Sequence, residues 1–178
     1  NIAIVSSTDG FGAAGKKQLE DLAPAEGITI VANEVYDKQA TDLTDVLTKI
    51  KGNPKVQAVV NWSIVPAQSI VAKNMKQLGM DMPLFQSHGF GNRKYVQQAG
   101  AAAEGILFPA SRLLVVEDLP ANHPQKEVLA TYKKDYESRL AAAQARLSEL
   151  LRSPVFVGKR SLVLVFEGMD AAGKGGGI

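Results

Sequence analysis

The residues of this 178-residue chain that are best suited to bind phosphate lie close to its C-terminus. Gly168, Gly173 and Lys174 follow an apolar run with the spacing of the P-loop pattern G-x-x-x-x-G-K-[ST]. Glycines let backbone N–H groups curl around phosphate oxygens, and the lysine would neutralise phosphate charge. Gly175 replaces the Ser or Thr of the pattern, so Asp170 becomes the candidate ligand for Mg²⁺.

A second stretch with chemical potential is the loop at residues 6–12. It follows an uninterrupted apolar run at residues 2–5, which is typical of a strand buried on both faces. The loop combines small polar residues, two glycines and an aromatic residue, among them Ser7, Asp9 and Phe11. In doubly wound parallel sheets, ligands bind beyond the carboxyl ends of the strands. We therefore expect this loop to border a ligand site.

The elements that must position this loop alternate regularly along the chain. The apolar pattern predicts strands at residues 2–5, 28–32, 56–61, 84–86 and 106–109. Helical patterns lie between them and begin near Ala13, at Thr41 or Asp42, at Pro66 and at Asn92. Short loops join these elements. The sequence therefore predicts a flavodoxin-like, doubly wound parallel α/β sheet with strand order 2-1-3-4-5.

A helix of nearly thirty residues is expected after Pro124, because no Gly or Pro interrupts its apolar spacing until Pro154. Its composition changes near residues 137–139, from mixed and charged to alanine-rich. We therefore predict two domains, at residues 1–137 and 138–178. In the second domain, the long helix leads to a strand at residues 161–166 and the P-loop fragment. We expect that strand to find apolar cover, since a bare edge would aggregate.

Composition limits the classes of function. The formal net charge is +2 and no basic stripe with interleaved aromatic residues occurs, so nucleic acid is not an expected partner. The chain has no cysteine, which excludes disulfides and thiolate chemistry. No apolar run is long enough for a membrane span. Neither an initiator Met nor a signal peptide is present, and we expect that the chain is cut at both ends.

Residues 1–137 resemble one lobe of a type I periplasmic binding protein, and in particular the Leu/Ile/Val-binding family of branched-chain amino acid ABC transporters. The likeness depends on the order and spacing of several short motifs. These lie at residues 4–12, 36–37, 41–44, 78–80, 87–90, 99–105 and 123–124. In that family two lobes close over a small solute and deliver it to a permease. The resemblance implies a periplasmic or extracellular location, a missing first lobe and no cofactor.

The resemblance also implies ligand contacts. Phe11 matches a position often held by an aromatic clamp, and Trp62 and Ser63 open the loop after the third strand. His88 lies where amino-acid binders carry an acidic residue for the ligand ammonium, which puts an α-amino acid ligand in question. Structural roles stay open: Asp9 could cap a helix, Phe11 could pack its own loop, and Trp62 could belong to a core. The candidate ligand-binding residues are Ser7, Asp9, Phe11, Trp62, Ser63 and His88.

Residues 138–178 resemble the segment that carries the P-loop in polyphosphate kinase type 2, a cytoplasmic enzyme family that moves phosphoryl groups between polyphosphate and nucleotides. The resembling residues are the alanine-rich helix and the run Glu-Gly-Met-Asp-Ala-Ala-Gly-Lys-Gly-Gly at residues 167–176. This likeness implies ATP or polyphosphate, with magnesium, as ligands. The sequence shows no lid or second acidic strand after the P-loop. It therefore does not decide whether the chain is an enzyme, but it favours the interpretation that the chain has no enzymatic activity.

Three hypotheses follow. The first is an incomplete extracytoplasmic solute-binding lobe of an ABC transporter, for branched-chain amino acids or a related small carboxylate or amide. The second is a fragment of a polyphosphate:nucleotide phosphotransferase with a binding lobe in front. The third is a chimeric or artefactual join with no intact function. This hypothesis is favoured because one family is periplasmic and the other is cytoplasmic.

Overall fold

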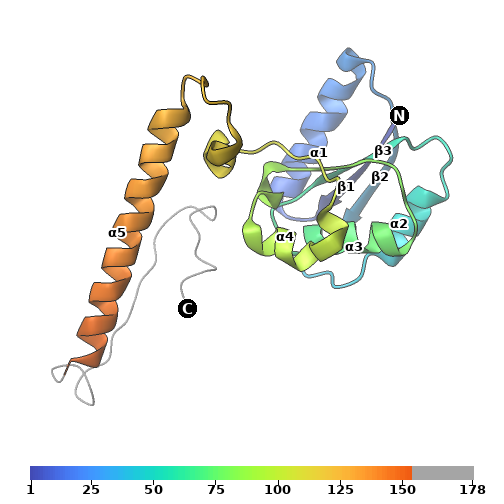
Figure 1. Cartoon of the computed structure of the whole chain (residues 1–178). Helices are drawn as coiled ribbons and strands as arrows, with labels where there is room; N and C mark the ends of the chain where they lie inside the picture. The colour runs from blue at the N-terminus through green and yellow to red at the C-terminus, as the bar shows by residue number, and fades with distance from the viewer. Residues whose placement is uncertain (154–178) are drawn as a thin grey trace. The chain divides into compact units, whose positions relative to one another are not determined.

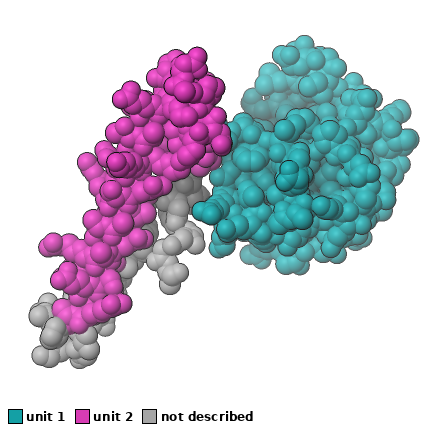
Figure 2. All heavy atoms as spheres, in the orientation of Figure 1, with its two compact units in different colours: residues 1–110 teal, residues 111–178 magenta. Residues whose placement is uncertain are grey.

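The structure, a computed structural model, describes residues 1–153. The chain forms two compact units, residues 1–110 and residues 111–178 (Figure 2). The first unit contains a parallel sheet in the order β2-β1-β3-β4 (Figure 1). Its strands are β1 at Ile2–Ser7, β2 at Ile30–Tyr36, β3 at Ala58–Trp62 and β4 at Leu84–Gln86. The predicted α/β class with a parallel sheet is confirmed.

Helices cover both faces of this sheet. They are α1 at Gly10–Leu22, α2 at Thr44–Lys51, α3 at Ala67–Gln77 and α4 at Arg93–Ala99. Short 3₁₀ turns lie at Ala23–Glu26 (η1), His88–Phe90 (η2) and Gly100–Ala103 (η3). Crossovers between parallel strands are right-handed. The chain adds β2 on one side of β1 and then adds β3 and β4 on the other side. Helix α1 therefore lies on one face of the sheet, and α2 and α3 lie on the other. Figure 1 shows this separation.

The core lies mainly between the sheet and α2 and α3. Alternate residues of the strands point to this face, as the period of a strand requires. Leu47, Ile50 and Val71 are fully buried against Val5 and Val59. Large aliphatic side chains removed from water in this way supply most of the stability of such a unit.

The predicted fifth strand does not form. Residues 106–109 contribute one bridge, in which Leu107 pairs with Phe85. Two hydrogen bonds hold it, from Gln86 N to Leu107 O at 2.8 Å and from Leu107 N to Leu84 O at 3.1 Å. The position beside β4 is therefore as expected, but the pairing stops early because β4 has three residues and Pro109 has no N–H to donate.

Some predicted boundaries were also wrong. The second strand extends to Tyr36 rather than ending at residue 32, because an edge strand tolerates polar residues on its partly exposed faces. The third strand begins two residues later and ends one residue later than predicted. Helix α1 begins at Gly10 rather than near Ala13, since Asp9 already caps it. Asn92 caps α4 as predicted, by accepting a hydrogen bond from Lys94 N.

The second unit is described for residues 111–153. It consists of a kinked 3₁₀ segment, η4 at Arg112–Asp118, and the helix α5 at Lys126–Arg152. The 27 residues of α5 confirm the predicted long helix. Val116 of η4 is buried, and the ammonium of Lys133 forms an ion pair with Glu117. These contacts join η4 to the first turns of α5.

The predicted domain boundary between residues 137 and 138 lies within α5, which runs through it without a break; the boundary stays a prediction. The predicted strand at residues 161–166 and the P-loop at residues 168–175 lie outside the described residues, as do their expected contacts. Within residues 1–153, no helix is both long enough and apolar enough to cross a membrane.

Candidate functional site

Three aromatic side chains that the sequence places far apart meet at the carboxyl edge of the sheet. Phe11 belongs to the first turn of α1, Trp62 ends β3, and His88 begins η2 after β4. The rings of Phe11 and Trp62 stack with centroids 6.0 Å apart and planes 15° apart. The His88 ring meets Phe11 edge-to-face, with centroids 5.5 Å apart. We call these three residues the aromatic cluster.

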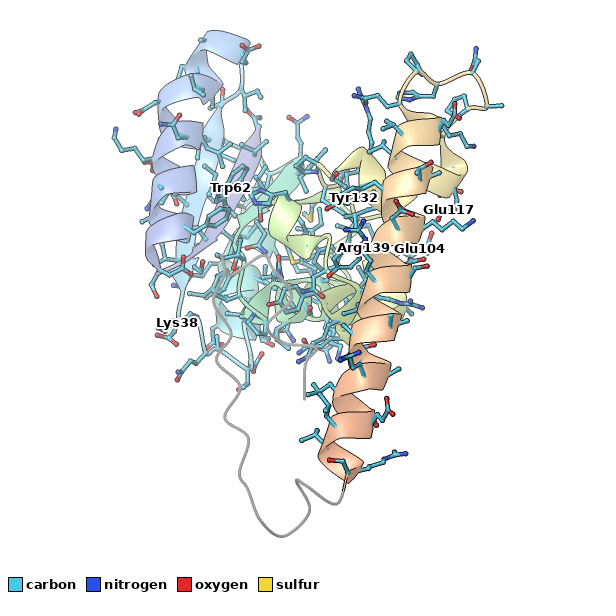
Figure 3. The ribbon with its side chains drawn as sticks, turned by 90° about the vertical axis from the view of Figure 1, so that its left-hand side faces the viewer. Lys38, Trp62, Glu104, Glu117, Tyr132 and Arg139 are labelled. Carbon is cyan, nitrogen blue, oxygen red and sulfur yellow. The ribbon has the colours of Figure 1, made fainter. Side chains whose placement is uncertain are left out.

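Close approach between α1 and the ends of the strands fixes Trp62. A Cβ atom added to Gly15 would lie 1.9 Å from both Cδ1 and Nε1 of the indole, so only glycine leaves room for the ring. Figure 3 shows Trp62 beside α1. Gly12 is equally constrained, because its added Cβ would lie 1.9 Å from Ser7 O. Gly12 and Gly15 therefore let the first turns of α1 pack closely against β1 and the Trp62 ring.

Asp9 is the N-cap residue of α1. Its Oδ1 accepts hydrogen bonds from Phe11 N at 2.9 Å and from Gly12 N at 3.0 Å. Burial raises the pKa of this carboxyl, but the nearby Ser7 hydroxyl and the two backbone N–H groups outweigh burial and lower the pKa below 3.8 overall. Asp9 is therefore ionised at neutral pH and holds the turn that carries Phe11.

Ser7 and Ser63 are both buried at this edge. The Ser63 hydroxyl accepts a hydrogen bond from Val65 N at 3.1 Å, and the Ser63 carbonyl accepts one from the Ser87 hydroxyl. The loops after β3 and β4 are thereby tied together. Of the six predicted ligand-binding residues, Phe11, Trp62 and His88 retain exposed surface and lie together. Ser7 and Ser63 are buried beneath them, and the half-buried Asp9 caps α1.

A buried chain of hydrogen bonds crosses the sheet below the aromatic cluster. The Tyr36 hydroxyl donates to Asn61 Oδ1 at 2.9 Å, and Asn61 Nδ2 donates to Gln86 Oε1 at 2.5 Å. Gln86 Nε2 in turn donates to the carbonyl of Gln68 at 3.0 Å. We call this the Tyr36–Gln86 chain. Sequence reasoning missed it, although a polar residue at or next to the end of three successive strands was a readable signal.

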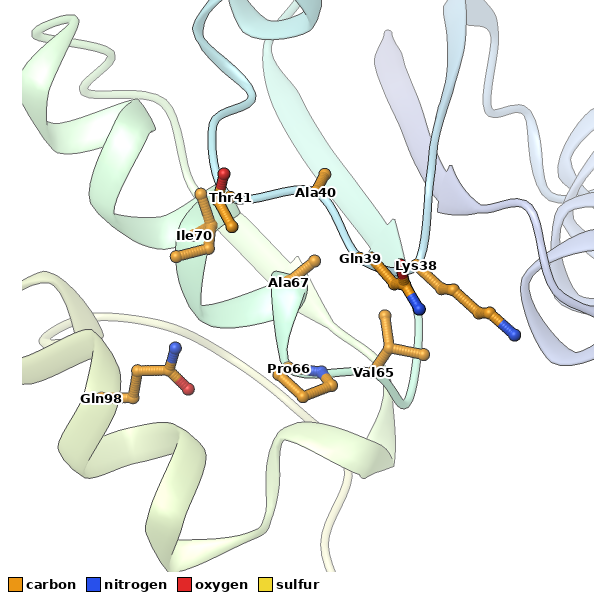
Figure 4. A pocket seen from close by; sticks show the side chains of 9 residues that line it. All are labelled: Lys38, Gln39, Ala40, Thr41, Val65, Pro66, Ala67, Ile70 and Gln98. Atoms are coloured by element: carbon orange, nitrogen blue, oxygen red, sulfur yellow. The ribbon is translucent and has the colours of Figure 1, made fainter.

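A separate hollow of about 380 Å³ is lined by the loops that follow β2 and β3 and by residues of α3 and α4 (Figure 4). Its lining is mainly apolar and includes none of the predicted ligand-binding residues. The lining residues are Lys38, Gln39, Ala40, Thr41, Val65, Pro66, Ala67, Ile70 and Gln98. No group of acidic and histidine residues suited to a metal ion occurs within residues 1–153.

The amino-acid sequence of residues 1–148 matches the family described as periplasmic binding protein. This match covers most of the chain, which therefore belongs to that family. An extracellular ligand-binding receptor from Rhodopseudomonas palustris HaA2 has a similar structure, with a TM-score of 0.68 and 25% identity over 77% of this chain. A branched chain amino acid ABC transporter from Thermus thermophilus with bound valine has a TM-score of 0.53 and 28% identity over 60% of this chain.

The chain spans only part of these proteins: 38% of the Rhodopseudomonas receptor and 28% of the Thermus protein. The type I binding-protein fold of the first unit agrees with the predicted lobe.

Residues 130–178 match a second family, polyphosphate kinase 2. A polyphosphate:AMP phosphotransferase from Pseudomonas aeruginosa is 59% identical over 46 residues, which are 26% of this chain and 9% of that protein. The same enzyme from Pseudomonas syringae pv. tomato is 40% identical over 84 residues, 17% of its length. The second resemblance is thus confirmed for the C-terminal part of the chain, and it covers a small part of each enzyme.

The Tyr36–Gln86 chain gives a first prediction. Tyr36→Phe removes the hydroxyl and leaves Asn61 Oδ1 buried without its donor, so the free energy of unfolding at pH 7 should fall by about 1–3 kcal/mol. Urea unfolding followed by the fluorescence of Trp62, the single tryptophan, measures this. Tyr132→Phe, at an exposed site on α5, is the control and should change stability by less than about 0.5 kcal/mol.

The pH dependence sharpens this test. Burial raises the pKa of Tyr36 from 10.0 to about 12, although its hydrogen bonds with Ser63 and Asn61 act in the opposite direction. A raised pKa stabilises the folded state fully below pH 10, and this contribution is lost as the pH rises from 10 to 12. The difference between wild type and Tyr36→Phe should shrink in that window; a constant difference would contradict the assignment.

Proposed function

We propose that residues 1–110 belong to one lobe of an extracytoplasmic solute receptor of an ABC transporter, and that this unit carries the part of the lobe that contacts the solute. The observation that carries this proposal is the aromatic cluster at the carboxyl edge of a doubly wound sheet, where such sheets bind ligands. Partly exposed Phe11 and Trp62 offer an apolar wall, and His88 offers a polar group beside it. Small-ligand sites combine apolar walls with a few polar groups in this way.

The solute that fits best is small and partly apolar: a branched-chain amino acid, or a related carboxylate or amide. The Thermus structure, 28% identical, contains bound valine, which supports an aliphatic solute. His88 replaces the acidic residue expected for an ammonium, which favours the carboxylate or amide. We propose that a second lobe completes the cleft, that a permease receives the solute, and that no cofactor takes part.

The central prediction concerns Trp62. Titration of the chain with valine, leucine, 4-methylpentanoate and 4-methylpentanamide should change the fluorescence of Trp62 for at least one of these solutes. Trp62→Leu should weaken the binding of that solute about ten-fold, because a flat wall of the site is lost. Thermal shift, which does not depend on tryptophan fluorescence, measures the affinity of this variant.

Gln98→Ala is the matched control, because Gln98 lines the separate hollow. It should leave affinity unchanged. If no solute binds the wild type at tens of millimolar, or if Gln98→Ala weakens binding while Trp62→Leu does not, the proposed site is wrong.

A second function is favoured by a separate observation, the match of residues 130–178 to polyphosphate kinase 2. In this alternative, Gly168, Gly173, Lys174 and Gly175 would bind a phosphate of ATP or polyphosphate, and Asp170 would bind magnesium. These residues lie outside the described part of the chain. Since the chain spans 9% and 17% of its phosphotransferase relatives, we propose phosphate binding rather than complete catalysis.

Polyphosphate binding tests this alternative. The wild-type chain should retain polyphosphate in a filter-binding assay with magnesium present, and Lys174→Ala should reduce retention several-fold because a phosphate-facing charge is lost. Lys133→Ala is a control for non-specific charge. Equal losses in both variants, or no retention by wild type, would contradict a P-loop site. Transfer of phosphate to AMP would extend the alternative to catalysis.

A further inference from the structure

Gly15 lies on the second turn of α1 and is not one of the residues assigned above to ligand contact. Its flank is filled by the Trp62 indole: an added Cβ would lie 1.9 Å from Cδ1, 1.9 Å from Nε1 and 2.5 Å from Cε2. Real Cβ atoms do not approach other atoms so closely. The first two of these distances are to atoms at the Nε1 edge of the indole, so the ring is seated in a notch that exists only because residue 15 has no side chain.

The same helix carries Phe11 one turn earlier, and Phe11 stacks on Trp62 with planes 15° apart. Phe11 and Gly15 are separated by four residues and so share one side of α1. The helix therefore contacts Trp62 at two adjacent positions: the Phe11 ring stacks on the indole, and the missing side chain of Gly15 leaves room for its edge. Because β1 and β3 pair with Ser6 opposite Trp62, the backbone of Trp62 is fixed as well.

We propose that Gly15 determines the solute specificity of the aromatic cluster, by setting how far the Trp62 ring stands from α1. This inference rests on the function proposed above. A methyl group at residue 15 closes the side of the ring that faces α1, and Trp62 is only partly buried. The ring then has to move toward its exposed side, into the space where a solute would lie. The site becomes shallower and should prefer smaller solutes.

The helix supplies a matched control. A Cβ added to Gly10, also in α1, would meet no atom within 4 Å. Gly10→Ala and Gly15→Ala therefore make the same chemical change in one helix, with and without a collision. A general effect of alanine on α1 would appear in both variants, whereas an effect on the Trp62 ring would appear in one.

The test uses thermal shift to compare the affinities of the full chain for two pairs of smaller and larger solutes: valine and leucine, and the unbranched carboxylates butanoate and hexanoate. Gly15→Ala should raise the ratio of affinities, smaller over larger solute, about ten-fold, since one methylene is worth about that much in a fitted pocket. Gly10→Ala should leave the ratio unchanged. Trp62→Phe added to Gly15→Ala removes the collision with a smaller ring and should return the ratio to that of Trp62→Phe alone.

Trp62→Phe by itself should shift the ratio in the opposite direction, toward the larger solute, and it stays informative if Gly15→Ala fails to fold. Unchanged ratios in Gly15→Ala and in Trp62→Phe, with solutes still bound, would overturn the role of Gly15 and leave the proposed binding function intact. Absence of binding by the wild-type chain would overturn both. A loss of affinity that is equal for all solutes would identify Gly15 as a packing residue only.

Discussion

The buried Tyr36–Gln86 chain is the interaction on which the candidate site depends. It joins the ends of β2, β3 and β4 through side chains that are removed from water, where an unpaired amide would cost more than its hydrogen bond contributes. The carboxyl ends of these three strands are therefore held at the same level of the sheet. The loops that begin there carry Trp62 and His88, and α1 brings Phe11 to them from β1.

The amino-acid sequence predicted most of this fold, because apolar runs and glycine or proline breaks reflect local physics. It failed at residues 106–109, where pairing depends on the length of the neighbouring strand, and at the ends of β2, where an edge position tolerates polar residues. Phe11, Trp62 and His88 were predicted as site residues from the family resemblance, and their places after strands agreed with it. Their mutual stacking and the notch at Gly15 were not predictable, because both depend on tertiary packing.

The helix α5 is the point at which the two family resemblances meet. Residues 130–148 belong to both matches, and all of them lie within this one helix. The helix therefore runs through the overlap of the two matches without a break. Each match covers part of a larger protein: 38% of the Rhodopseudomonas receptor and 9% of the Pseudomonas aeruginosa phosphotransferase.

Hydrogen–deuterium exchange of the full chain, with and without the solute that binds most tightly, tests the central claim most directly. A solute held by the aromatic cluster should slow exchange in peptides covering residues 8–12, 62–66 and 87–91, because these loops follow β1, β3 and β4. Peptides covering residues 44–51 of α2 should not change. Protection confined to residues 38–41 and 93–99, around the separate hollow, would contradict the account and place the solute elsewhere.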